Sequence, residues 1–77
     1  MLKFLKRESA FETIRAEELQ VGDRFVYGDI SPVVVLTIGM DDRGMDVIFD
    51  RTRNGDRLGM VHQVQIPREL LMTIVKR

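Results

Sequence analysis

Residues 47–66, VIFDRTRNGDRLGMVHQVQI, predict a β-hairpin. The pair Asn54-Gly55 stands between two runs typical of β-strands, Val47–Arg53 and Asp56–Ile66. A two-residue Asn-Gly connection favours a type I′ turn, which needs positive φ at both central positions. Such a turn also predicts the strand register: Arg53 opposite Asp56, Phe49 opposite Met60, and Val47 opposite His62.

Alternation along the two strands assigns their faces. The set expected to point inward is mostly apolar and comprises Val47, Phe49, Leu58, Met60, His62, Val64 and Ile66. His62 is therefore expected to be a half-buried imidazole with a backbone hydrogen bond. Arg51 falls on this apolar side too, opposite Leu58. We expect the hairpin tip to project beyond the core, so that Arg51 is not buried there.

Turn signals divide the rest of the chain into short segments. They are Gly22-Asp23, Gly28-Asp29 and residues 41–44. The expected strands are Thr13–Ala16, Asp23–Tyr27, a central Val33–Ile38 buried on both faces, the two hairpin strands, and Glu69–Val75. The predicted fold is mainly β: a small five-stranded SH3-like barrel or a strongly bent antiparallel sheet. It forms a single domain, 1–77, with an N-terminal arm or short helix over residues 1–11 and the barrel over 12–77.

The last strand is apolar on both faces, which is unusual for an exposed edge. We expect either the N-terminal arm or another subunit to cover it. A self-association surface is therefore predicted on the arm or on the last strand, at Leu71, Thr73 and Val75.

Composition limits the possible functions. The 77 residues contain no cysteine, which excludes disulfides and thiolate metal sites. Twelve basic and twelve acidic residues cancel, which argues against a dominant, sequence-independent attraction to nucleic acid or anionic membrane. No apolar run suits a secretory signal or a membrane span, so a cytoplasmic location is expected.

The stretch from Ile14 to Asp23, IRAEELQVGD, carries the pattern I-x-A-x-x-L-x-x-G-D. In this stretch the chain resembles small SH3-like β-barrel proteins of actinobacterial bacteriophages. The resemblance implies a fold type and a viral origin, hence the host cytoplasm, and it implies no catalytic residue. Physically, Leu19 would cap the barrel, Gly22 would permit a tight turn, and Asp23 would accept hydrogen bonds from the turn's amides.

Residues that suggest catalysis or metal binding are sparse. His62 is the only histidine, and without cysteine or a second histidine it makes a poor ligand set. Asp41, Asp42 and Asp46 match no calcium loop and predict a solvated turn. We therefore expect no metal, no cofactor and no enzymatic activity. An enzyme would have to use His62 with acidic partners.

The arginines Arg51, Arg53 and Arg57 surround the predicted hairpin tip, with Arg43 expected nearby. Arginine binds phosphate or carboxylate as a bidentate fork, so this cluster is a candidate binding patch. Asp50 and Asp56 would neutralise two of these arginines, and the tip carries no aromatic residue for base stacking. The sequence thus favours a non-enzymatic module, a phage accessory protein that binds a protein partner or itself. A nucleic-acid-binding barrel that uses the arginine tip is the alternative.

Overall fold

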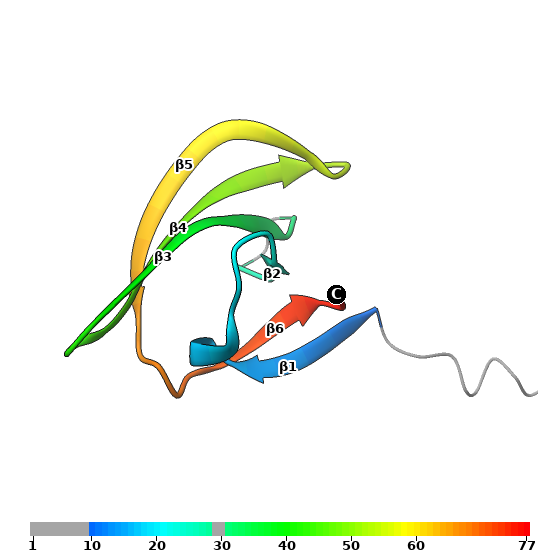
Figure 1. Cartoon of the computed structure of the whole chain (residues 1–77). Coiled ribbons are helices and arrows are strands. Elements are labelled where there is room, and N and C mark those ends of the chain that lie inside the picture. Colours follow the sequence, from blue (N-terminus) through cyan, green and yellow to red (C-terminus); the bar gives the residue numbers. More distant parts are fainter. Residues whose placement is uncertain (1–9, 29–30) are drawn as a thin grey trace, which may run out of the picture.

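The computed structural model describes residues 10–28 and 31–77. In these residues one antiparallel sheet of six strands curls into a half-barrel, in the order β1-β6-β2-β3-β4-β5 (Figure 1). The strands are β1 Phe11–Arg15, β2 Arg24–Phe25, β3 Val33–Asp41, β4 Gly44–Arg53, β5 Asp56–Ile66 and β6 Leu71–Val75. A 3-10 helix, η2 Ala16–Glu18, follows β1. The predictions of a mainly β chain and a strongly bent antiparallel sheet are confirmed.

All six segments expected to be strands form strands, so the prediction of a five-stranded barrel is wrong by one strand. The short β2 pairs on both sides. Phe25 lies opposite Val33 of β3 and opposite Ile74 of β6, so a two-residue strand joins the two parts of the sheet. β1, β2 and β6 also differ by a few residues from their predicted bounds, and β1 begins within the predicted arm. β3 ends three residues later than predicted, and β4 begins three residues earlier. The rest of that arm, residues 1–9, lies outside the described residues.

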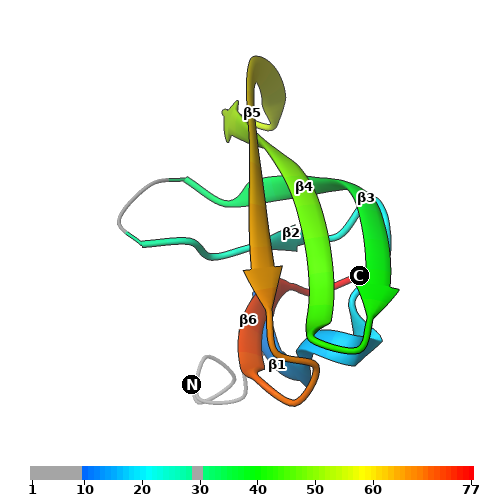
Figure 2. The same ribbon diagram turned by 90° about the vertical axis from the view of Figure 1, so that its left-hand side faces the viewer.

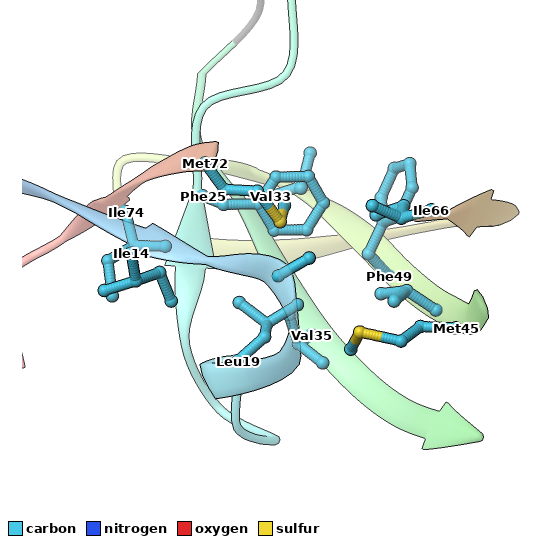
Figure 3. Close-up of a cluster of buried hydrophobic side chains, with 12 residues drawn as sticks. Ile14, Leu19, Phe25, Val33, Val35, Met45, Phe49, Ile66, Met72 and Ile74 are labelled. Atoms are coloured by element: carbon cyan, nitrogen blue, oxygen red, sulfur yellow. The ribbon is translucent and has the colours of Figure 1, made fainter. Parts of the chain in front are cut away.

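The core occupies the concave side of the curled sheet (Figure 3). Phe25 and Phe49 meet there edge to face, with ring centroids 5.4 Å apart. The buried apolar residues are Ile14, Ala16, Leu19, Phe25, Val33, Val35, Met45, Val47, Phe49, Ile66, Met72 and Ile74. β3 is an interior strand as predicted, but it is not buried on both faces, because Val34 and Leu36 on its other face are only half-buried.

The hairpin keeps its predicted turn but loses its predicted register. Asn54 and Gly55 both have positive φ, 54° and 88°, and Arg53 lies opposite Asp56. Beyond a bulge the register moves by two residues, so Phe49 lies opposite His62 rather than Met60. Val47 likewise lies opposite Val64 rather than His62. A shift of two residues preserves the predicted alternation of side chains, which has period two. Burial differs from the prediction, because Leu58 and Met60 of the inward set are 39% and 46% exposed, whereas Asp50 of the opposite set is buried.

The L-x-x-G-D stretch is explained by packing and turn geometry. Leu19 is buried, Gly22 has φ of 96°, and the Asp23 carboxylate accepts the Gln20 backbone N–H at 2.9 Å. Arg77 donates two hydrogen bonds to the same carboxylate, from Nε at 3.0 Å and from Nη2 at 2.8 Å. Asp23 thereby fastens the end of the described chain to the turn before β2.

The last strand is not an edge of the sheet. β1 pairs with it along its whole length, from Phe11 opposite Val75 to Arg15 opposite Leu71, and β2 contacts its other side. β1 thus covers the last strand, which we had expected the N-terminal arm or another subunit to cover.

Gly44 is the tightest backbone position among the described glycines. It begins β4 with φ of 141°, and a Cβ atom there would lie 2.6 Å from the carbonyl oxygen of Ile66. This close approach brings the β3–β4 turn against the end of β5, so no side chain fits.

We predict that Gly44→Ala lowers the free energy of unfolding by about 2 kcal/mol, because the methyl group meets a backbone carbonyl and φ is unfavourable. Gly39→Ala is the matched control in the neighbouring strand, since its Cβ would meet nothing within 4 Å. The control should keep or slightly raise stability. Urea unfolding of both variants measures this, and equal stability of the two would contradict the close approach.

Candidate functional site

β5 is an edge strand of the described sheet. Among residues 10–28 and 31–77 it pairs only with β4, and its other side carries no strand (Figure 2). The edge segment, Met60–Ile66, contains no Asp, Glu, Lys, Arg or Pro. Gly59 in the bulge precedes it and Pro67 follows it. Exposed edges are normally protected by charges, prolines or bulges, and here such protection stands only at the two ends.

An apolar groove lies beside the end of this edge segment, on the open side of the half-barrel. Its volume is about 380 Å³. We call it the open-side groove. It is formed by three stretches, Phe25–Tyr27, Val64–Pro67 and Leu70–Thr73. Tyr27 and Leu70 are 46% and 47% exposed there, so apolar surface remains accessible.

Four rings form a connected cluster, and two of them, Phe25 and Tyr27, line the groove. Tyr27 contacts Phe25 and Phe49, with ring centroids 6.2 and 5.0 Å apart respectively. His62 stacks on Phe49 with the centroids 5.5 Å apart. The prediction that His62 is half-buried and lies opposite Val47 is wrong: it lies opposite Phe49 and is exposed, because none of the described strands covers this edge.

A buried carboxylate fixes where the edge segment begins. Asp50 of β4 is 0% exposed and accepts three hydrogen bonds from β5. Arg57 Nε donates at 2.8 Å, the Gly59 N–H at 3.1 Å and the Met60 N–H at 2.8 Å. Gly59 has φ of 76°, which lets the backbone turn both of these amides toward the carboxylate.

These contacts also determine the charge state of Asp50. The hydrogen bond from Arg57, helped by those from Met60 and Gly59, holds the pKa of Asp50 below its ordinary value of 3.8, although burial acts in the opposite direction. The hydrogen bond from Arg77 likewise lowers the pKa of Asp23. Both carboxylates therefore favour the ionised form in the folded protein.

The predicted arginine cluster is only partly assembled. Arg53 is exposed at the tip, whereas Arg57 is bound to Asp50 and Arg51 is half-buried opposite Val33. Arg43 is not nearby, which corrects that expectation. It precedes β4, while Arg53 ends it, and a ten-residue strand spans about 30 Å.

Arg43 instead lies in a polar hollow of about 240 Å³ at the opposite end of the hairpin. There Asp41 accepts the backbone N–H groups of Arg43 and Gly44, and Arg68 donates to the Asp41 carbonyl. The acidic turn thus binds its own amides. Within the part of the chain that the structure describes, no cluster of acidic or histidine side chains suits a metal ion, and no helix has the length and apolarity needed to cross a membrane.

The predicted self-association residues lie on a face rather than at an edge. Leu71 and Thr73 are exposed and Val75 is half-buried. Their part in self-association stays a prediction. β1 pairs with one side of their strand along its whole length, and the short β2 pairs with its other side only at Ile74.

The open-side groove was not predicted from the sequence. Tyr27 was expected at the end of a strand, and nothing local in the sequence shows that Val64 and Leu70 line the same groove as its ring. The available signal was the uncharged run Met60–Ile66, which is unusually long for an exposed strand.

No family model, no curated protein sequence and no solved structure matches the chain.

We predict that Asp50→Asn lowers the melting temperature at pH 7 by roughly 10 °C, because an amide cannot accept all three hydrogen bonds. A carboxyl whose pKa is lowered on folding stabilises the fold above its unfolded pKa, and this contribution is lost as pH falls through the folded pKa. The wild type should therefore lose stability below about pH 4, and its advantage over the variant should shrink there.

Thermal melts between pH 3 and 7 test this, with Asp42→Asn, an exposed turn residue, as the control. The control should melt close to the wild type throughout. A variant at Asp50 that matched the wild type at pH 7 would show that the carboxylate is not needed for the hairpin.

Proposed function

We propose that this chain is a non-enzymatic binding module that takes an extended segment of a protein partner along β5. The observation that carries the proposal is the juxtaposition of the uncharged edge segment with the open-side groove. Strand addition uses both features, because the backbone edge provides affinity and adjacent pockets select side chains.

The position of the groove indicates which side chains of the bound segment would be recognised. A strand laid beside Val64 would place alternate side chains toward the core side of the sheet, as β5 itself does. Those side chains would meet the exposed apolar surface of Tyr27 and Leu70. The outward-facing side chains would remain in solvent and would carry little specificity.

The resemblance of residues 14–23 to small phage barrels belongs to the same proposal. An accessory protein that acts by binding needs a recognition surface and no catalytic group. The edge segment with the open-side groove supplies such a surface in a chain of 77 residues.

Nucleic-acid binding at the hairpin tip is the alternative, and fewer contacts support it. Arg57 is held by Asp50, and Arg43 lies at the other end of β4. Arg53 and the exposed part of Arg57 would have to bind phosphate without a stacking ring beside them.

Affinity capture from the host, with and without nuclease, tests the proposal. The matched variants are Leu70→Glu in the groove and Met40→Glu on β3, since the two side chains are 47% and 54% exposed. We expect capture of a protein partner that nuclease does not abolish. Leu70→Glu should lower the amount captured about tenfold, because a buried unpaired carboxylate costs more than about 1.4 kcal/mol. Met40→Glu should leave the amount captured unchanged. Capture that disappears with nuclease would favour the alternative, and capture unaffected by Leu70→Glu would exclude the groove.

A further inference from the structure

The edge segment is suited to pair with itself. Its seven residues run from the bulge to Pro67 and are centred on Gln63. Because the segment carries no Lys, Arg, Asp or Glu, two copies laid side by side bring no like charges together along it. The whole chain has a formal net charge of zero, so long-range repulsion does not oppose association either.

We infer that the extended segment bound along β5 is the β5 strand of a second copy, antiparallel and related by a two-fold axis at Gln63. This inference rests on the proposed role of β5 as a strand-accepting edge. In an isologous contact the same patch serves both partners, and a two-fold axis perpendicular to the sheet places opposed residues on the same face.

The register about Gln63 pairs each side chain with one on the same face of the sheet. On the inward face Met60 lies opposite the partner's Ile66, and His62 lies opposite the partner's Val64. On the outward face Val61 lies opposite the partner's Gln65, and the two Gln63 side chains face one another. Both glycine bulges and both prolines then stand at the ends of the paired region, where an interrupted ladder does least harm.

The contact would also cover surface that the monomer leaves open. Met60 and Val61 are 46% and 54% exposed, and His62 stacks on Phe49 with its other side in solvent. Pairing would remove both strands' edges and join the two half-barrels into one continuous sheet. Burying an unprotected edge in this way also prevents further strand addition.

A charge swap at Gln63 tests the inference. Gln63 is exposed on the outward face, so neither Gln63→Lys nor Gln63→Glu should disturb the fold, which thermal melts check. Sedimentation at about 50 μM should show a dimer for the wild type, since micromolar affinity suffices for a contact of this kind. Each variant alone should sediment as a monomer, because two like charges face each other at the axis.

An equimolar mixture of the Lys and Glu variants should recover the dimer, and added salt should weaken it. A monomeric wild type, a Gln63→Lys variant that still dimerises, or a mixture that stays monomeric would each overturn the inference. These results differ from failure of the proposed function. A monomeric wild type that still captures a partner through Leu70 keeps the groove as the site and removes only the second copy as its occupant.

Discussion

The buried carboxylate of Asp50 is the contact on which the geometry of this molecule depends. It lies within the β4–β5 hairpin with no solvent exposure, and it accepts hydrogen bonds from Arg57, Gly59 and Met60. A buried ionised group is tolerable only when it is paired and fully hydrogen-bonded. The three donors meet this requirement because β5 bulges toward the carboxylate, and the bulge advances the strand by two residues.

The position of the bulge determines which residues of β5 form the free edge of the sheet. It places His62 over the ring of Phe49 and leaves the uncharged run up to Pro67 as the free side of the sheet. A second irregularity, between Val35 and Thr37, interrupts the pairing of β3 with β4. Bulges bend and twist a sheet. The two irregularities therefore fit the strong curl of β3–β5 (Figure 1). The groove lies on the open side of this curl.

Local signals were enough to predict the turn and much of the sheet. Asn54-Gly55 specifies a tight turn by itself, and the bounds of β5 follow from its neighbours Gly55 and Pro67. The register was missed because it depends on hydrogen bonds from β5 to the Asp50 carboxylate on β4. The residues next to Asp50 in the sequence do not indicate that its carboxylate is buried. The exposure of His62 and the groove beside Tyr27 were missed for a related reason. Both depend on which strand lies at the edge of the sheet, and the order of strands is set by long-range contacts.

The register of the hairpin tests the central claim most directly. Nuclear Overhauser contacts across the β4–β5 ladder distinguish the two possibilities in a single spectrum of the folded protein. The account predicts contacts of Phe49 with His62 and of Val47 with Val64. Contacts of Phe49 with Met60 and of Val47 with His62 would contradict it, because they would mean that β5 pairs without the bulge that Asp50 holds.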